Sequence, residues 1–464
     1  MRKNRSIGKV FLLFLLMPFL AYSQCWKEIS TGRWNSVGVK NDGTLWTWGN
    51  NWYGQLGDGT TVYKTSPVQI GNANWKSIIT TPAEDYVLAI KSDDSLWGWG
   101  SNFHGLMGGP INENKTSPVE IGSAANIKIM SPGEHILTVR TDGTLWARGD
   151  NTFGQLGDGT ITDQNFNYIQ IGTGTNWKTV GVGVFHSIAL KTDGTLWAWG
   201  FNSTGQLGDG TNVYKTSPVQ IGIDTNWKSI SAGPNYNLAL KTDGTLWAWG
   251  YNVNGKVGDG TTIDKFVPTQ IGTTSDWKSI AAGVNHSLAI KDNGTLWAWG
   301  DNSTGQLGDG TYLNKLVPTQ IGAQNNWKTA VGGYNHTLAL KTDGSLWSWG
   351  DNGSGQLGDG TNVEKIIPTA ISCPTSLTLQ VNENVIKNEG IVLYPNPAKT
   401  SFMIKNLSGI KMVKVYNEEG KLTGSYINTN IINIESLQQG IYWVKIEDLK
   451  GNTVIRKLIK TEEK

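Results

Sequence analysis

The chain is short of basic charge, of long apolar runs and of catalytic motifs. Residues 25–376 carry 23 Lys and Arg against 28 Asp and Glu, a net charge of about −5. Proteins that bind nucleic acid need a basic excess or stripe to neutralise phosphates, so we expect no nucleic-acid partner. The longest apolar run, Val10 to Leu20, has about 11 residues, whereas a helix that spans a bilayer needs about 20. We therefore expect no membrane span in the mature chain.

The residue patterns that usually mark an active site are missing as well. No Ser/His/Asp order, paired-carboxylate motif or phosphate loop stands out from a repeat that runs along the chain. We therefore predict no catalytic residues, no cofactor and no metal site, and we do not expect the protein to be an enzyme.

Residues 1–23 form a predicted signal peptide. A basic start is followed by the apolar run and then by Ala21 and Ser23, small residues that fit signal-peptidase cleavage before Gln24. Cys25 suggests a lipoprotein as the alternative, although Gln24 precedes it where such sites want a small residue. The mature protein is therefore expected to be exported.

A phrase of about fifty residues repeats seven times between residues 25 and 374. Its anchor is Leu-Trp-x-Trp-Gly, and the first tryptophans of the copies are Trp46, Trp97, Trp146, Trp197, Trp247, Trp297 and Trp347. A period of about 40 to 50 residues built from strand-like pieces is typical of a β-propeller with one blade per repeat. We predict an all-β chain in which residues 25–374 form a seven-bladed propeller of four-stranded antiparallel blades.

The copy at residues 277–322 predicts four strands. Trp277 to Ile280 alternates and ends at an Ala-Ala-Gly break, and His286 to Lys291 alternates again. An Asp-Asn-Gly hairpin turn leads into Thr295 to Gly300, and Pro318 to Ile321 supplies the outer strand. Tryptophans on one face of the third strand and alanine on the other allow each blade to pack against the next, so we expect the tryptophans to be core.

The repeat resembles the regulator of chromosome condensation family. The family signature joins Gly-x-x-His-(Ser/Thr)-Leu-Ala-Leu, Asp-Gly, an aromatic-x-Trp-Gly and Asn-x-x-Gly-Gln-Leu-Gly. It stands here as Gly283-Val-Asn-His286-Ser-Leu-Ala-Ile and Asp301-Asn302-Ser-Thr-Gly305-Gln-Leu-Gly308. The resemblance covers residues 26 to about 372 and implies a seven-bladed propeller. The family includes nucleotide-exchange factors, a plant ultraviolet photoreceptor and a secreted β-lactamase inhibitor, so it implies no single function.

Two activities of that family lack their residues here. The exchange factor uses an insertion as a wedge, for which repeat spacings of 49 to 51 residues leave no room. The photoreceptor uses a Gly-Trp-Arg-His run, and the corresponding positions read Val184-Phe185-His186, Val284-Asn285-His286 and Tyr334-Asn335-His336. Only Arg33-Trp34, in reversed order, is similar. We therefore expect neither activity.

A second resemblance begins after the repeats. Residues 375–390 read as a polar linker, and residues 391–464 contain Leu393-Tyr-Pro-Asn-Pro397, Val413-Lys-Val-Tyr-Asn417 and Gly440-Ile-Tyr-Trp-Val-Lys445. This segment is similar to the type A C-terminal sorting domain of the type IX secretion system found in Bacteroidetes. Its alternating strands predict a small β-sandwich. The resemblance implies that the type IX machinery takes the protein from the periplasm to the cell exterior, where it is extracellular or attached to the outer-membrane surface.

Two sets of polar residues recur at fixed positions of the repeat. Histidines at one slot are expected to satisfy backbone groups between blades, because Asn35, Tyr86 and Tyr236 take the same slot in other copies. Aspartates in Gly-Asp-Gly-Thr loops are expected to form turns, since one carboxylate per loop is too few for calcium. The histidines are His135, His186, His286 and His336, and the aspartates are Asp58, Asp158, Asp209, Asp259, Asp309 and Asp359.

The residues just before the histidine slot vary from copy to copy. They join two strands of each blade and should fall on one face of the ring. We predict a binding rim there, with Trp34, Phe185 and Tyr334 as anchors, although drift in loosely constrained loops would explain the same variety. The predicted rim consists of Arg33, Trp34, Glu84, Asp85, Glu134, Phe185, Asn235, Asn285, Tyr334 and Asn335.

The sequence thus predicts an exported propeller that serves as a binding or protein-interaction module for an extracellular protein or glycan. The alternative is a secreted carbohydrate-active or other hydrolytic enzyme that uses the central mouth of the ring. Acidic side chains converging at one rim would favour that alternative. Cys25 and Cys373, the only cysteines, bracket the propeller and are predicted to form a disulfide in an oxidising compartment.

Overall fold

The computed structural model divides into two compact units, with the boundary between Pro374 and Thr375. The described residues are 25–103, 105–110, 112–374, 391–405, 409–417, 422–449 and 453–461, without the side chain of Phe166. The predicted signal peptide, the predicted linker and His104 lie outside them. No helix within these ranges is long and apolar enough to cross a membrane.

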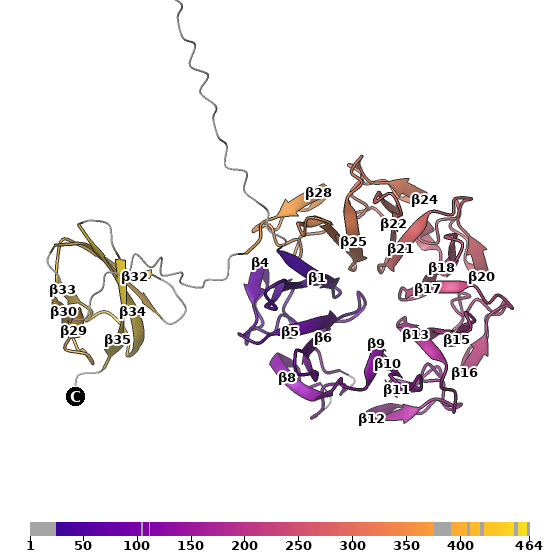
Figure 1. Ribbon diagram of the computed structural model, residues 1–464, viewed down its shortest axis with the longest axis horizontal. Helices are drawn as coiled ribbons and strands as arrows, with labels where there is room; N and C mark the ends of the chain where they lie inside the picture. The colour runs from indigo at the N-terminus through magenta and orange to yellow at the C-terminus, as the bar shows by residue number, and fades with distance from the viewer. Residues whose placement is uncertain are drawn as a thin grey trace, which may run out of the picture. The chain divides into compact units, whose positions relative to one another are not determined.

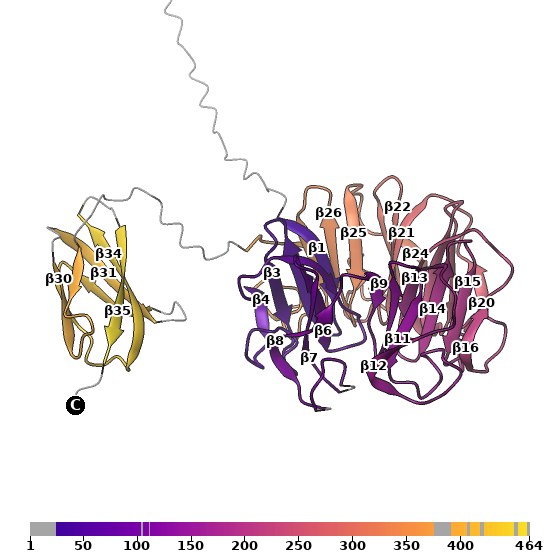
Figure 2. The same cartoon turned by 60° about the horizontal axis from the view of Figure 1, so that its bottom comes forward.

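In its described part, the first unit is a ring of seven four-stranded antiparallel sheets (Figure 1). Each sheet, or blade, takes its four strands in chain order from one repeat. Figures 1 and 2 show the first strands near the axis of the ring and the fourth strands at its outside. The first strands are β1 (Trp26–Thr31), β5 (Trp75–Ile79), β9 (Ile127–Ser131), β13 (Trp177–Val182), β17 (Trp227–Ala232), β21 (Trp277–Ala282) and β25 (Trp327–Gly332).

The remaining strands of the ring follow the same order in every blade. The second strands are β2 (Asn35–Lys40), β6 (Tyr86–Lys91), β10 (His135–Arg140), β14 (His186–Lys191), β18 (Tyr236–Lys241), β22 (His286–Lys291) and β26 (His336–Lys341). The third strands are β3 (Leu45–Gly49), β7 (Ser95–Gly100), β11 (Leu145–Gly149), β15 (Leu196–Gly200), β19 (Leu246–Gly250), β23 (Leu296–Gly300) and β27 (Leu346–Gly350). The outer strands are β4 (Lys64–Gln69), β8 (Lys115–Ser123), β12 (Gln164–Gln170), β16 (Lys215–Gln220), β20 (Lys265–Gln270), β24 (Lys315–Gln320) and β28 (Lys365–Ile371). A single short 3₁₀ turn, η1 (Val253–Gly255), interrupts this pattern within the described residues.

The strands predicted in residues 277–322 are present with shifted ends. The first strand, β21, continues to Ala282, so the predicted Ala-Ala-Gly break begins too early. Both alanines are small enough to line the axis of the ring while remaining paired with β22. The outer strand, β24, begins at Lys315 and not at Pro318, because Lys315 pairs with Gly300 across a register shift. Gly294 has a φ of +79°, as the predicted hairpin turn requires.

Neighbouring blades pack large side chains against shallow faces. Leu288 and Ile290 of the sixth blade share a buried cluster with Trp327 and Trp349 of the seventh. In six of the seven blades the second tryptophan of the motif is fully buried, and its Nε1–H donates to a backbone carbonyl of the preceding blade, as Trp349 does to Gln306 at 2.9 Å. The same arrangement recurs in Trp48, Trp99, Trp199, Trp249 and Trp299. Burying such rings stabilises each junction by about 1.5–3 kcal/mol per side chain.

The third blade carries Arg148 in place of the second tryptophan. Its Nη2–H donates to the Leu106 carbonyl of the preceding blade at 2.6 Å, and its Cζ lies 4.7 Å from the Tyr168 ring centre. The arginine therefore keeps the inter-blade hydrogen bond that an indole makes elsewhere.

The first tryptophan of the motif lies closer to the surface than the second. Trp97, for example, is only partly buried, and the Lys91 ammonium lies 3.3 Å from its ring centre.

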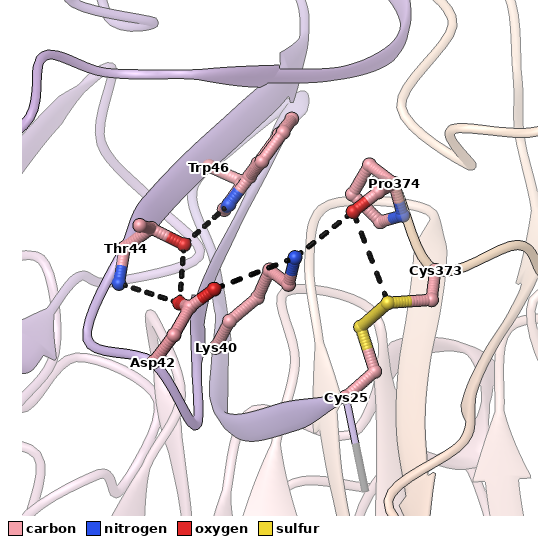
Figure 3. The surroundings of a disulfide bond; sticks show 7 residues. All are labelled: Cys25, Lys40, Asp42, Thr44, Trp46, Cys373 and Pro374. Carbon is pink, nitrogen blue, oxygen red and sulfur yellow. Dashed lines mark hydrogen bonds and ion pairs between the residues drawn. A yellow bond between two sulfur atoms is a disulfide. The ribbon is translucent and has the colours of Figure 1, made fainter. Parts of the chain in front are cut away.

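The ring closes without sharing strands between its two ends. β1 pairs only with β2 and β28 only with β27, so no sheet mixes the first and last repeats. Closure instead uses the ordinary blade contacts, such as the Trp48 Nε1–H donating to Gln356 O at 3.0 Å. The one covalent link is the predicted disulfide between Cys25 and Cys373, which joins residues 348 apart in the sequence (Figure 3). Beside it, Lys40 Nζ donates to Pro374 O at 2.9 Å.

The second unit is the predicted small β-sandwich. One sheet has the order β29-β30-β33 and the other β32-β31-β34-β35. Phe402, Val415 and Val444 belong to the buried cluster between them. The strands are β29 (Val392–Tyr394), β30 (Ser401–Lys405), β31 (Ile410–Asn417), β32 (Leu422–Ile427), β33 (Ile431–Asn433), β34 (Gly440–Asp448) and β35 (Thr453–Lys460).

Candidate binding face

Two loops of every blade meet at the same end of the ring. The loop before the second strand ends in one variable residue, and the loop after the third strand begins with another, 16 residues further along in all seven repeats. In each blade the backbone N–H of the second residue donates to the carbonyl of the first, at 2.8–3.1 Å. The seven pairs define the variable face: Trp34–Asn50, Asp85–Ser101, Glu134–Asp150, Phe185–Phe201, Asn235–Tyr251, Asn285–Asp301 and Asn335–Asp351.

The predicted rim residues all lie in the loops between first and second strands, and therefore at this face. Backbone bonds tie neighbouring loops together across blade junctions. The Arg33 N–H donates to Glu84 O at 3.0 Å, and the Tyr334 N–H donates to Arg33 O at 3.0 Å. The face is thus held by the blades beneath it and by bonds within its own surface.

An aromatic cluster with one arginine spans the junction of the seventh and first blades. The Trp34 ring lies 5.6 Å from Tyr334 and 6.2 Å from Trp52 between ring centres. The Arg33 guanidinium lies 5.1 Å from the Trp34 ring and 5.7 Å from the Tyr334 ring. Trp52, on the loop after β3, is 64% exposed. Cation–π contacts of this kind contribute about 0.5–1 kcal/mol at exposed sites.

A second aromatic cluster lies at the fourth blade. The Phe185 ring is 5.2 Å from Phe153 and 6.3 Å from Phe201, and Phe153 and Phe201 are 4.6 Å apart. All three rings are only partly buried. Phe153 comes from the third blade, so this cluster also bridges a blade junction. Two of the predicted anchors, Trp34 and Tyr334, therefore share one cluster, and Phe185 belongs to another.

Acidic side chains gather between the two clusters, on the second and third blades. Burial, then the carboxyls of Glu134 and Asp85, raise the pKa of Glu84 to about 8, although Arg33 opposes the shift. Burial and then Asp150 raise the pKa of Glu134 to about 7. Arg33 Nη1 lies 3.8 Å from Asp85 Oδ2. One arginine thus faces a group of carboxyls whose mutual repulsion and burial disfavour the charged form.

The fifth to seventh blades present amides and a buried lysine. The Asn285 Nδ2–H donates to Asn335 Oδ1 at 3.2 Å across a blade junction. Lys256 takes the slot that glutamine fills in most other copies, and its Nζ lies 4.7 Å from the Tyr251 ring centre. Burial lowers the pKa of Lys256 to about 8, although Asp264 and Asp301 oppose the shift. The face therefore differs in chemistry from one sector to the next.

The recurring histidines lie beneath the face and contact polar side chains of the next blade, which the prediction of bonds to backbone did not include; His186 also has a hydrogen bond with the Pro234 backbone. Each Nε2 lies 2.7–3.1 Å from a polar side chain of the next blade, as His286 does from Thr337 Oγ1 at 2.9 Å. The tyrosines in the same slot do bond to backbone: the Tyr86 hydroxyl donates to Gly133 O at 2.6 Å. Burial lowers the pKa of His286 to about 3. The four histidines are spread around the ring and do not form a common site.

Asn35 occupies the histidine slot of the first blade without a protein partner. Its side chain is fully buried, and neither Nδ2 nor Oδ1 has a hydrogen bond. The residue that would face it in the second blade is Val87; the third blade carries Ile136 at this position, and the other five blades carry Ser, Thr or Asn. The apolar Val87 of the second blade thus leaves the Asn35 amide of the first blade unpaired.

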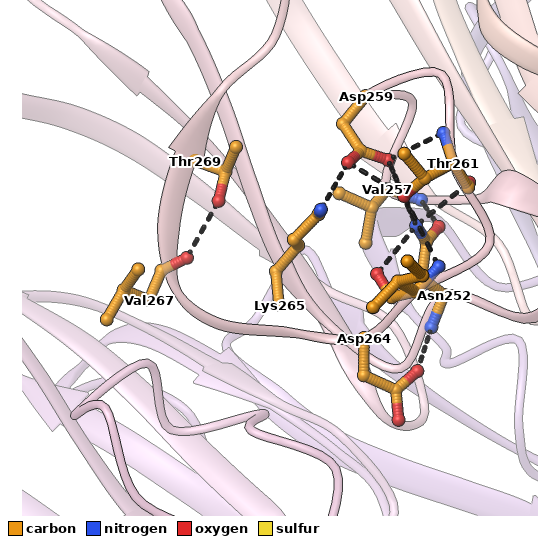
Figure 4. Close-up of polar contacts among 9 residues, drawn as sticks. Asn252, Val257, Asp259, Thr261, Asp264, Lys265, Val267 and Thr269 are labelled. Carbon is orange, nitrogen blue, oxygen red and sulfur yellow. Dashed lines mark hydrogen bonds and ion pairs between the residues drawn. The ribbon is translucent and has the colours of Figure 1, made fainter.

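The recurring aspartates form turns, as predicted. Asp259 Oδ1 accepts hydrogen bonds from the Thr261 N–H at 3.1 Å and from Asn252 Nδ2 at 3.1 Å, and Lys265 Nζ lies 2.5 Å from Oδ2 (Figure 4). Partial burial opposes ionisation, but these bonds lower the pKa of Asp259 below its usual value. Within the described residues, no group of three or more His, Cys, Asp or Glu side chains could hold a metal ion.

The first strands surround a central channel that has a different lining. Residues of all seven blades enclose a cavity of about 240 Å³, and its described lining consists of Ser, Thr, Pro, Gly, Ala, Val and Ile residues. Ser131 and Ser231 are among them. No carboxyl belongs to this lining, so the acidic group on the second and third blades lies on the surrounding face and not in the channel.

Sequence reasoning missed the second half of the variable face. Trp52, Phe153 and Asp150 all follow the Trp-Gly or Arg-Gly that ends the third strand. The signal that could have found this half is the constant spacing of 16 residues between two variable slots in every repeat, which identifies Asp150 directly and places Trp52 and Phe153 in the loops that begin at the second slot. Because two strands paired antiparallel from end to end separate these slots, as Asn35 pairs with Gly49, the slots return to the same edge of the blade.

Family models match both units. The RCC1-like domain matches residues 167–388, and two models of the regulator of chromosome condensation (RCC1) repeat match residues 42–80 and 26–55. The secretion system C-terminal sorting domain matches residues 392–461. The chain is an RCC1-type propeller with a C-terminal sorting domain. The sorting domain indicates export to the cell surface or secretion.

Known relatives resemble the RCC1-type propeller over part of their length. The ultraviolet-B receptor UVR8 of Arabidopsis thaliana is 29% identical over 198 residues, which are 42% of this chain and 45% of the receptor. The E3 ubiquitin-protein ligase HERC2 of Homo sapiens is 27% identical over 191 residues, 40% of this chain and 4% of the ligase. The match thus spans less than half of the length of either relative.

Two solved structures show the same fold. Human WBSCR16 aligns with a TM-score of 0.62 and 22% identity, covering 71% of this chain and 95% of that one. Prp20p from Saccharomyces cerevisiae aligns with a TM-score of 0.63 and 21% identity, covering 77% and 89%. At these identities the likeness concerns the fold of the RCC1-type propeller and carries no function with it.

Proposed function

We propose that this protein is an exported binding module whose variable face engages an extracellular protein or glycan. One observation carries the proposal. The strands repeat nearly the same residues in every blade, whereas the two loop slots at one end of the ring differ from blade to blade. A rigid scaffold that presents variable loops on one face is the usual arrangement of a binding platform.

The aromatic clusters are the proposed anchors. Trp34, Tyr334 and Phe185 are partly buried and pack against other rings, so their side chains lose little conformational entropy when a partner binds. The exposed Trp52 adds apolar area beside the first cluster. Aromatic side chains on a rigid surface are frequent hot spots, which supports this choice.

The acidic sector would orient the partner. Glu84, Asp85, Glu134 and Asp150 lie between the two aromatic clusters, and the Arg33 cation acts on both Glu84 and Glu134. A partner that places a cationic group there would restore the charged form of these carboxyls and would bind more weakly as salt rises.

Capture from native culture fluid tests the proposal. The full-length chain is used as bait beside the variants Trp34→Ala/Phe185→Ala/Tyr334→Ala and Ile223→Ala. Ile223 is 91% exposed and lies on the connection between β16 and β17, at the other end of the ring. We expect the wild type and Ile223→Ala to retain the same partner and the triple variant to lose it. Retention of that partner by the triple variant would contradict the proposal.

We propose that the signal peptide directs the protein to the periplasm. The type IX machinery then recognises residues 391–464 and exports the protein from the periplasm. Deleting residues 391–464 should leave a folded propeller in the periplasm, because the ring buries its own sheets without that unit. Fractionation of the cells measures this. Normal export of the truncated chain would show that residues 391–464 are not the export signal.

A second candidate function is hydrolysis, which the gathering of Glu84, Asp85 and Glu134 in one sector of the face favours. A carboxyl held protonated near neutral pH can act as a general acid, and the pKa of Glu84 is raised to about 8. We nevertheless propose that the protein is not an enzyme, because these carboxyls lie on the outer face of the ring and none belongs to the lining of the central mouth, where the hydrolytic alternative places its site. Release of reducing sugar from polysaccharide by the full chain, abolished in Glu84→Gln, would reverse this preference.

A further inference from the structure

The sorting domain carries a basic and aromatic surface on one of its sheets. β34 is flanked by β31 and β35, and Trp443 lies directly between Tyr416 and Lys457 on the paired strands. Two residues along, Lys445 lies directly opposite Lys414 of β31. These five side chains, which we call the basic face, alternate with buried residues of the sandwich core and point away from it.

The two opposed lysines have no ionic partner in the described part of the domain. Like charges directly opposite each other on a sheet destabilise it. Glu447, two residues after Lys445, is engaged by Lys411 at 2.7 Å. Neither Lys414 nor Lys445 belongs to an ion pair among the described residues. Among the described residues, the pair therefore presents uncompensated positive charge on the outward side of the sheet.

Aromatic area accompanies this charge. Trp443 is 42% exposed, and Tyr416 beside it is partly exposed. Tryptophan and tyrosine on a rigid surface are frequent anchors of protein interfaces, whereas lysine alone is not. Residues 391–464 contain 11 Lys and Arg against 7 Asp and Glu, the opposite balance to the propeller. A surface of this composition complements an acidic one.

We propose that the basic face is the surface by which the sorting domain docks onto an acidic protein surface of the secretion machinery. This inference rests on the proposed route of export. The lysines steer the domain to its receptor and fix its orientation, and Trp443 supplies the apolar contact at the centre.

The opposite sheet provides a matched control surface. Met403 lies directly opposite Ile431 there, and both side chains are exposed. This row is apolar, and nothing about it selects an acidic receptor. The variants Met403→Thr/Ile431→Thr and Lys414→Glu/Lys445→Glu thus change the two outward surfaces of one sandwich without touching its core.

The test uses the full-length chain in the bacterium that naturally produces it, with fractionation into periplasm, surface and medium. We expect Lys414→Glu/Lys445→Glu to lower the exported fraction at least about tenfold, since charge reversal turns attraction into repulsion. Lys414→Arg/Lys445→Arg and Met403→Thr/Ile431→Thr should be exported like the wild type. Melting temperatures of the purified full-length variants must agree, which separates docking from folding.

Two outcomes would overturn the inference. Normal export of Lys414→Glu/Lys445→Glu would exclude the basic face, and a block in Met403→Thr/Ile431→Thr alone would move docking to the opposite sheet. The chain lacking residues 391–464 distinguishes a wrong docking face from a wrong export route. If that chain is retained while the charge-reversed variant is exported, only the face is wrong, whereas export of both removes the proposed route.

Discussion

Burial shifts the pKa values of titratable side chains of the ring, downward for histidine and upward for glutamate. Burial disfavours a charge, so the pKa of His286 falls to about 3 and that of Glu84 rises to about 8. Both groups are therefore neutral in the folded ring near pH 6. Stability should be greatest there and should decline on both sides.

Replacing Glu84 by glutamine should remove part of the decline on the alkaline side. The folded-state pKa lies above the ordinary 4.5, so the stability that Glu84 contributes is complete below about pH 4.5 and is lost as the pH rises through about 8. Thermal melts of the full chain between about pH 5 and pH 9 should be flatter for Glu84→Gln. The exposed Glu120→Gln serves as control, and an unchanged alkaline slope in Glu84→Gln would contradict the argument.

Replacing His286 by glutamine should act on the acid side. Its folded-state pKa lies below the ordinary 6.5, so its contribution is complete above about pH 6.5 and is lost as the pH falls towards 3. Each pKa unit corresponds to about 1.4 kcal/mol, so the acid loss is on the order of a few kcal/mol. Denaturant titrations at pH 7 and pH 4, expressed as a difference in unfolding free energy, should show a smaller acid loss in His286→Gln. An equal loss in variant and wild type would argue against it.

At the scale of single residues, the sequence shows which positions of the repeat recur, but it does not show which residues their side chains contact. The histidine slot is evident because it recurs, and its burial follows from its place before an apolar strand. That His286 contacts Thr337, and that Asn35 has no partner, depends on which residue of the next blade stands opposite. The period of the repeat does not reveal that relation. The clustering of Glu84, Asp85 and Glu134 is hidden for the same reason.

The loop after the third strand is the element that shapes the outer half of the variable face. In the fifth blade Asn252 Nδ2 donates to Asp259 Oδ1 and to the carbonyls of Thr261 and Ile263, while the Val257 N–H donates to Asn252 Oδ1 at 2.9 Å (Figure 4). One buried side chain thus ties four points of the loop together. Asparagine takes this position in all seven blades.

Asn252→Ala should destabilise the ring by about 1–3 kcal/mol, because the Val257 N–H would remain buried without an acceptor. Thr269→Ala, which removes an exposed hydroxyl that donates to Val267 O, should change stability by less than about 0.5 kcal/mol. Denaturant unfolding measures the stability of both variants.

Neither calcium nor a chelator should change the melting temperature, because Thr261, Asn252 and Lys265 already complete the contacts of Asp259 in its turn. A rise of the melting temperature with calcium would support a metal site instead.

Elements with strong alternation were predictable to the residue, and those with small or proline residues were not. His286–Lys291 is the observed β22, because alternating large and small side chains leave one register. β21 extends past its predicted end, since alanines at the axis remain paired although they look like a break. β24 starts before its proline, because an outer strand needs pairing on one side only.

At the scale of the whole molecule, one covalent link reinforces the closure of the ring. No strand is exchanged between the first and last blades, so the seventh junction has the same contacts as the other six and the Cys25–Cys373 bond in addition. The bond closes a loop of 348 residues. Chain entropy gives an upper bound of roughly 5–6 kcal/mol for such a loop.

Cys25→Ser/Cys373→Ser should therefore lower the unfolding free energy by several kcal/mol and open the ring first at its seventh junction. Hydrogen exchange of the full chain should quicken in β1 and in β28 before it changes in β14 or β18. The wild-type chain with reductant should behave like the variant. Uniform exchange around the ring in the variant would show that closure does not rely on the disulfide.

The number of blades and the pairing of the cysteines follow from the sequence, because a period is visible and only two thiols exist. The partition of the variable face into acidic, aromatic and amide sectors does not. Trp34 and Tyr334 are 300 residues apart in the chain, and only the curvature of the ring brings them within 5.6 Å.

The central claim is that this face binds the partner, and one measurement tests it most directly. With the captured partner in hand, its affinity is measured for the full-length Trp34→Ala, Phe185→Ala and Tyr334→Ala chains beside Ile223→Ala at the other end of the ring. We predict a loss of at least about tenfold, or about 1.4 kcal/mol, at each aromatic position, an unchanged affinity for Ile223→Ala, and unchanged melting temperatures. Wild-type affinity in all three aromatic variants, or a loss confined to Ile223→Ala, would contradict the account.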